Sequence, residues 1–178
     1  MRIPDVAGYA VGWRTWTTGN PALPPCLSSL RGDRWPHRTP LIAGCRANDV
    51  PPSFDPHYRT QLHNAPEESC TCGIYALRTE LQLFAEDLGG PAVAPMMSTA
   101  VIQLSQLRSV SPILAIIGKV ALWGKVIEHT EGFRAEYAYP LELWALDAPQ
   151  ALVTDLHFGY GVPVRRVSTG KFLSTLLS

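Results

Sequence analysis

The chain has 178 residues, of which 46% are hydrophobic and 17% are charged, a composition that is typical of a globular protein and excludes a disordered one. Fifteen basic residues balance fifteen acidic ones, so the formal net charge is zero. The chain therefore lacks the basic excess that is typical of proteins that bind nucleic acid strongly and nonspecifically. A local basic patch is still compatible with a net charge of zero. The length predicts a single domain over residues 1–178.

The N-terminal stretch MRIPDVAGYAVGW lacks the apolar core of a secretory signal, and the chain has no run of about 18 apolar residues. We therefore expect a cytoplasmic protein that does not enter a membrane. In a reducing compartment, closely spaced cysteines favour metal or redox roles over structural disulfides.

The N-terminal third is rich in proline, with many of the sixteen prolines before residue 66. This predicts a loop-rich region with only short elements. We expect a first strand over residues 9–18, a short apolar piece at residues 27–30 and a second short strand at residues 41–45. Residues 46–62 are predicted to form a loop.

From Ile74 the apolar residues recur at spacings of three and four, which is typical of an amphipathic helix. The stripe consists of Ile74, Leu77, Leu81, Phe84 and Leu88, and we expect it to face the core. The glycine pair at residues 89–90 ends the predicted helix. Residues 89–111 are interpreted as an insertion or linker.

The C-terminal half carries the clearest strand pattern. Residues 112–129, which are rich in β-branched side chains, and residues 133–146 are predicted to form a hairpin. The connecting residues end in Gly132, which we expect to be left-handed. A helix is expected next, with Asp147 as its N-cap, Pro149 in its first turn and Gly159 near its end.

Residues 162–168 are a candidate last strand. Residues 168–178 form an amphipathic tail, which could pack on its own chain or on a second subunit as a homodimer.

The chemistry of the chain is concentrated in a candidate metal site with the spacing C-x17-H-x6-C-x-C. Its residues are Cys45, His63, Cys70 and Cys72. Zinc prefers four such ligands in a tetrahedron. Buried unliganded thiols and a redox or nucleophilic thiol are the alternatives, and Cys26 and His57 are rival ligands. Four protein ligands would make the zinc structural, whereas three would leave a position for a catalytic water.

These elements together predict an α+β fold. Its centre is a small, mostly antiparallel sheet or a partly open barrel, with one main helix at about residues 74–88. We expect a zinc ion to tie the loop-rich N-terminal region to this core.

The order of sequence blocks resembles that of a group of uncharacterised actinobacterial and actinophage proteins. The matching blocks are VGWRTW, RWPHRTPLIAGC, HNAPEESCTCGIYAL, IIGKVALWGKVIEHTEGFRAEYAYPLEL and YGVPV, and residues 89–111 lie outside them. The group has no established activity, so the resemblance implies no function. It implies that the cysteine and histidine block and the hairpin belong to one domain.

The predicted hairpin also carries a candidate binding surface. Its residues are Trp123, Glu128, His129, Arg134, Tyr137 and Tyr139. Aromatic rings and a planar arginine fork suit a nucleic acid or a protein partner. We further expect Arg134 to pair with Glu128 across the two strands.

No catalytic residue is predicted. The sequence has no recognisable nucleophile motif and no glycine-rich phosphate loop. The adjacent Glu128 and His129 would point to opposite faces of a strand and could not act together.

The preferred function is therefore a non-enzymatic, zinc-stabilised binding or regulatory module. The alternative is a metal-dependent hydrolase with an open zinc site near Glu128 or His129. A third hypothesis is an interaction protein that dimerises through its tail.

Overall fold

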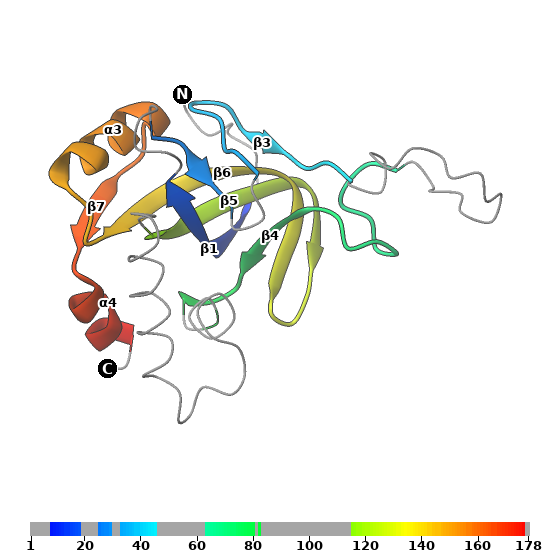
Figure 1. Cartoon of the computed structure of the whole chain (residues 1–178). Helices are drawn as coiled ribbons and strands as arrows, with labels where there is room; N and C mark the ends of the chain where they lie inside the picture. The colour runs from blue at the N-terminus through cyan, green and yellow to red at the C-terminus, as the bar shows by residue number, and fades with distance from the viewer. Residues whose placement is uncertain are drawn as a thin grey trace, which may run out of the picture.

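The computed structural model describes residues 8–18, 25–29, 33–45, 63–80, 82 and 115–176. Over this part of the chain the predicted α+β class is confirmed: a mostly antiparallel sheet bends into a partial ring beside one main helix (Figure 1). The strands are β1 (Ala10–Thr18), β2 (Leu27–Ser28), β3 (Leu41–Ile42), β4 (Ile74–Leu77), β5 (Ala115–Glu128), β6 (Gly132–Leu146) and β7 (Val164–Val167). The helices are α3 (Gln150–Tyr160) and α4 (Thr169–Leu176).

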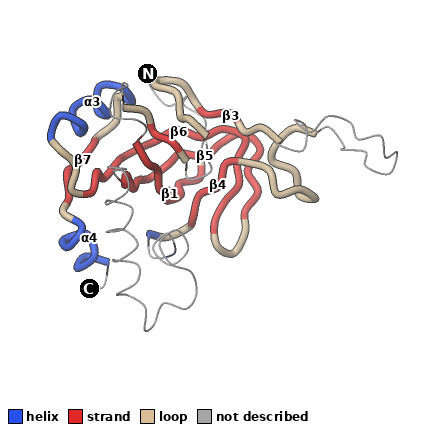
Figure 2. The backbone as a smooth tube through the Cα atoms, viewed as in Figure 1, coloured by secondary structure: helices blue, strands red, loops and turns tan. Residues whose placement is uncertain are grey.

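The long β5–β6 hairpin is the centre of the sheet (Figure 2). Its antiparallel ladder extends from the pair Ile116–Ala145 to the pair Glu128–Phe133, with two register shifts of the kind that bend strands. The other edge of β5 pairs with β1. The other edge of β6 pairs with β4, β3 and β7 in turn, and β7 alone is parallel to it.

A single residue pair closes the ring of strands. β4 lies between β6 and β1, and Trp13 of β1 pairs with Leu77 of β4. At its far end β1 pairs with β2 instead, through Thr17 and Thr18. The order β1–β5–β6–β4–β1 is therefore a small barrel with a short seam, as the prediction of a partly open barrel requires.

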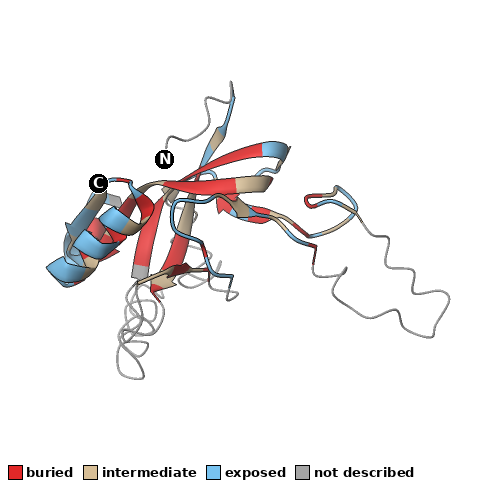
Figure 3. Ribbon diagram, turned by 90° about the horizontal axis from the view of Figure 1, so that it is seen from above, coloured by how far each residue is buried: buried red, intermediate tan, exposed pale blue. Residues whose placement is uncertain are grey.

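The hydrophobic core gathers buried positions from the strands and from α3 (Figure 3). Trp16 of β1 is fully buried, and its ring meets Trp35 edge-on with the centroids 5.2 Å apart. Aromatic pairs of this geometry add about 0.5–1.5 kcal/mol to the stabilisation from burial alone. α3 contributes Val153, Leu156 and Tyr160 to the same core.

The helix predicted from Ile74 is wrong at its start, because residues 74–77 form strand β4. Their backbone pairs with β6, which buries Ile74 and Ala76 and exposes Tyr75. The three-residue spacing from Ile74 to Leu77 is typical of a helix, but the alternation within these four residues fits the strand that tertiary pairing selects.

A helical turn begins at Glu80 instead, after a capping box. The N–H of Gln82 donates to Thr79 Oγ1 at 3.2 Å, and the N–H of Thr79 donates to Gln82 Oε1 at 3.0 Å. Residues 81 and 83–88 of the predicted helix lie outside the described residues, and so does the candidate insertion at residues 89–111. The main helix of the described part is α3.

The helix expected after the hairpin is confirmed as α3, with Gly159 near its end, but its N-cap differs from the expectation. The N-cap is Pro149, whereas Asp147 has a positive φ of 49° and its carboxylate accepts a hydrogen bond from Thr169 Oγ1 at 2.5 Å. The helix ends at Gly161, which is left-handed and donates its N–H to the carbonyl of His157. Asp147 therefore joins the end of β6 to the start of α4.

The predicted hairpin is confirmed, but its turn is tighter than expected. His129 and Gly132 exchange two backbone hydrogen bonds, so only Thr130 and Glu131 lie in the turn. Gly132 is not left-handed. Glycine is required there because a Cβ would lie 2.1 Å from the carbonyl oxygen of Ala76 in β4.

The C-terminal tail forms α4 and packs on its own chain. Phe172 is buried in a small cluster with Ile117 and Leu146. Dimerisation through the tail stays a prediction. Neither described helix combines the length and the apolar character that crossing a membrane requires.

We predict that Tyr160→Phe lowers the free energy of unfolding by about 1–3 kcal/mol, measured by urea denaturation. The Tyr160 hydroxyl accepts the N–H of Leu27 at 2.8 Å and donates to the carbonyl of Trp35 at 2.8 Å, so its loss leaves a buried N–H unpaired. The control is Tyr9→Phe, at an exposed position. Equal effects of the two substitutions would contradict the proposed role of the hydroxyl.

Candidate metal centre

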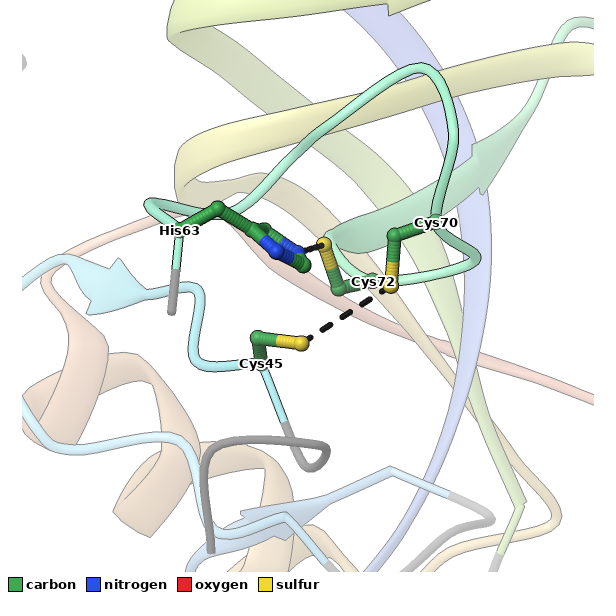
Figure 4. Close-up of side chains that lie close together, drawn as sticks. All are labelled: Cys45, His63, Cys70 and Cys72. Atoms are coloured by element: carbon green, nitrogen blue, oxygen red, sulfur yellow. Dashed lines mark hydrogen bonds between the residues drawn. The ribbon is translucent and has the colours of Figure 1, made fainter. Parts of the chain in front are cut away.

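The four predicted zinc ligands come together at the end of the barrel that lies away from α3 and α4 (Figure 1). Cys45 lies on the segment that leaves β3, and the other three ligands lie on the loop that leads into β4. Figure 4 shows the side chains pointing toward one another, and we call these four residues the metal centre: Cys45, His63, Cys70 and Cys72.

The distances within the metal centre suit a tetrahedral metal ion. One donor atom from each of the four residues lies within 4.8 Å of the others. The sulfurs of Cys45 and Cys70 are 3.7 Å apart, and His63 Nε2 lies 3.2 Å from Cys72 Sγ. Bonds of about 2.3 Å from zinc to sulfur give tetrahedral edges of about 3.8 Å. Three thiols and an imidazole at these distances could therefore hold a metal ion such as zinc.

The loop at residues 63–73, which carries His63, Cys70 and Cys72, is called the ligand loop, and it leads into β4 at Gly73. This residue has a φ of 124°, and a Cβ on it would lie 3.0 Å from Pro66 Cβ and 3.2 Å from Arg134 Cβ. A larger residue would be strained in this conformation and too close to its neighbours. Gly73 thus lets the chain pass from Cys72 directly into the sheet.

Arg134 of β6 holds the ligand loop against the barrel. The residue is only 5% exposed, and its guanidinium donates to the carbonyl oxygens of Glu67 at 3.4 Å, of Cys72 at 3.1 Å and of Cys70. Its Nε donates to His129 Nε2 at 2.8 Å. One guanidinium nitrogen, Nη1, thus faces all three carbonyl oxygens, while Nε donates to the imidazole.

The charge of Arg134 also fits a metal-loaded centre. Its hydrogen-bond partners among the described residues are carbonyl oxygens and an imidazole, whereas a buried cation needs a compensating negative charge. A divalent ion with three thiolates and a neutral histidine carries a net charge of −1. The loaded centre would therefore supply the charge that the buried guanidinium needs.

The two closest thiols in the sequence have different acidities. The pKa of Cys70 is lowered to about 7, mainly by a hydrogen bond from the backbone N–H of Cys72 and also by the side chains of Cys72, Cys45 and His63, against the opposing effect of burial. Burial raises the pKa of Cys72. Near neutral pH, Cys70 is therefore the more readily ionised of the two, and the thiolate is the form that binds metal.

Of the two rival ligands, only Cys26 lies among the described residues, and it is not part of the metal centre. Cys26 lies beside β2, where its thiol donates to the carbonyl of Trp35 at 3.0 Å and lies 3.7 Å from the Tyr160 hydroxyl. It is a packed thiol, as the alternative interpretation of this residue expects. His57 lies outside the described residues.

Half of the predicted hairpin surface is buried. Trp123, Arg134 and Tyr139 are 8%, 5% and 6% exposed, so they present no ring face or donor fork to solvent. Tyr137 is partly buried, and its ring stacks on Trp123 with the centroids 5.9 Å apart. Binding of a partner by the hairpin stays a prediction, and it would need other residues to provide most of the contact.

The expected ion pair between Arg134 and Glu128 does not form. The register places Arg134 opposite Ile127 rather than Glu128. The carboxylate of Glu128 instead lies 2.7 Å from a guanidinium nitrogen of Arg78, at an exposed position near the turn. The polar groups of the hairpin therefore serve two different contacts, one at its tip and one behind the ligand loop.

A groove of about 970 Å³ lies beside the metal centre. Its lining includes the three cysteines of the centre, β3, β4 and the tip of the hairpin. Ile42 is 65% exposed and Tyr75 is 39% exposed within this lining. Neither residue is among the binding residues predicted from the sequence. In the sequence, Ile42 could have been recognised only as an apolar residue in a very short predicted strand, close to the candidate ligand Cys45.

Comparison with known proteins adds no further constraint: no family model, no curated protein and no solved structure matches the chain.

We predict that Arg134→Met lowers the affinity for zinc about 10–100-fold, the usual effect of removing a group that orients metal ligands. The substitution keeps an unbranched side-chain stem but removes the guanidinium and with it the donors to the ligand loop. The measurement is competition with a chromophoric chelator, with circular dichroism to establish that the variant is folded.

The matched control is Lys125→Met. Lys125 also comes from the hairpin and binds the same loop, through the carboxylate of Glu67 at 2.9 Å, but its side chain is 47% exposed. An exposed ion pair contributes little, so the control should keep its zinc affinity. Equal zinc affinities for a folded Arg134→Met variant and its parent would rule out the orienting role.

Proposed function

We propose that this chain is a zinc-stabilised, non-enzymatic binding module. The observation that carries the proposal is the convergence of three thiols and one imidazole within 4.8 Å of one another. Soft thiolate ligands with a single histidine are typical of structural zinc sites. The ion would join the segment after β3 to the loop before β4, two parts of the chain that share few other elements of regular structure.

A structural role is favoured over hydrolysis because the four protein ligands would fill a tetrahedral ion. No coordination position would then be left for a water molecule. The residues that a hydrolase would use are also engaged elsewhere: Glu128 is paired with Arg78, and His129 accepts a hydrogen bond from Arg134. These contacts support the binding module over the hydrolase.

The groove beside the metal centre is the proposed binding surface. Ile42 and Tyr75 offer exposed apolar area there. The acidic residues of the lining outnumber its arginines: they are Asp33, Glu68 and Glu131 against Arg14 and the buried Arg134. Acidic side chains repel a phosphate backbone, and the chain as a whole has no basic excess. We therefore propose an extended polypeptide segment as the partner, with an apolar side chain flanked by lysine or arginine.

We predict that the purified chain contains about one zinc ion, measured by elemental analysis, and that Cys72→Ser lowers the free energy of unfolding by roughly 3–5 kcal/mol. Loss of a ligand removes binding energy that contributes to folding. The control is Cys26→Ser, which alters a cysteine outside the metal centre. A metal-free protein whose stability does not respond to added zinc would refute the proposal.

We predict that peptides selected from a displayed random library on the zinc-loaded protein lose at least tenfold in affinity on Ile42→Glu. The substitution places a charge on the apolar part of the groove. Phe158→Glu is the matched control, because Phe158 on α3 is 67% exposed but does not line the groove. Equal losses for the two variants would contradict the proposed surface. If the protein bound a single-stranded oligonucleotide more tightly than the selected peptides, and this binding weakened with salt, the proposed partner would be a nucleic acid and not a polypeptide.

A further inference from the structure

The four donors of the metal centre form two pairs of unlike chemistry. The sulfurs of Cys45 and Cys70 are in contact at 3.7 Å, whereas the sulfur of Cys72 is in contact with His63 Nε2 at 3.2 Å. Cys45 and Cys72 are buried, and Cys70 is half-buried. An oxidant that arrives from solvent would therefore meet the sulfur of Cys70 first, and the nearest thiol partner would be Cys45.

We propose that the metal centre is a peroxide-sensitive switch, in which oxidation joins Cys45 to Cys70 and releases the zinc ion. The inference rests on the proposed zinc site and adds its regulation. Its basis is the contact between two thiols from separate segments, together with the partial exposure of one of them.

The chemistry balances with hydrogen peroxide as the oxidant. The Cys70 thiolate attacks one peroxide oxygen, the O–O bond breaks, and a sulfenic acid forms while the second oxygen takes up a proton and leaves as water. The Cys45 thiolate then attacks the sulfur of the sulfenic acid, and its hydroxyl leaves as a second water after protonation. Two thiolates lose two electrons, one peroxide gains them, and two protons are consumed.

The metal leaves because only two of its four ligands remain available. A disulfide sulfur is a much poorer ligand than a thiolate, so His63 and Cys72 alone would have to hold the ion. The new covalent bond joins the same two segments that the ion joined. After oxidation, the segment that leaves β3 would therefore stay joined to the loop before β4. The part of that loop around Cys72, which lines the groove, would be released from the metal ion.

The experiment uses the full chain with Cys26→Ser, so that the metal centre contains all of the remaining thiols. The zinc-loaded protein is treated with hydrogen peroxide, and released zinc is followed with a chelating dye. Free thiols are counted in parallel, and the disulfide is located by peptide mapping without reduction. The expected result is the loss of two thiols for each zinc ion released, a Cys45–Cys70 disulfide, and full recovery after a thiol reductant and added zinc.

Three outcomes would overturn the inference. These are zinc retained after the thiols are oxidised, a Cys70–Cys72 disulfide as the main product, and zinc release accompanied only by sulfinic or sulfonic acids that a reductant does not reverse. Failure of the zinc proposal itself is seen earlier, because a chain that takes up no zinc under reducing conditions fails before any peroxide is added.

Discussion

The buried guanidinium of Arg134 is the contact on which the arrangement of the molecule depends. It extends from the central strand of the barrel to the carbonyl oxygens of the ligand loop, and its other side meets the hairpin through His129. A cation in this position is costly unless the surrounding groups are oriented toward it. The loop must therefore adopt the turn that places Cys70 and Cys72 together, and a metal ion bound by the thiolates would complete the charge balance.

This dependence explains how a proline-rich region can share a fold with a regular barrel. The segments that leave β3 and enter β4 contribute few backbone ladder bonds of their own. Four side chains and one arginine fix their positions in place of a longer sheet. The groove follows from this construction, because loops held at a few points leave a concave space between β3 and β4 rather than a packed layer.

The cluster of Cys45, His63, Cys70 and Cys72 could be predicted from the sequence because cysteine and histidine are scarce, and four of them with compatible spacing leave few combinations. The helix at Ile74 could not be excluded, because β4 is only four residues long and its pairing with β6 is a tertiary effect. The role of Arg134 was hidden for a related reason. An arginine on a strand is usually solvated, and only the passage of the ligand loop across β6 buries it.

The sequence distances of these contacts imply an order of assembly. The β5–β6 hairpin closes through a turn of neighbouring residues, so its loop entropy is small and it can form early. The metal centre joins residues 25 positions apart, and Arg134 reaches a carbonyl 64 positions away. Of these contacts, the hydrogen bonds of Arg134 need the hairpin, because β6 carries the guanidinium. We therefore expect the barrel to act as the template for the ligand loop, and a metal ion to bind late in folding.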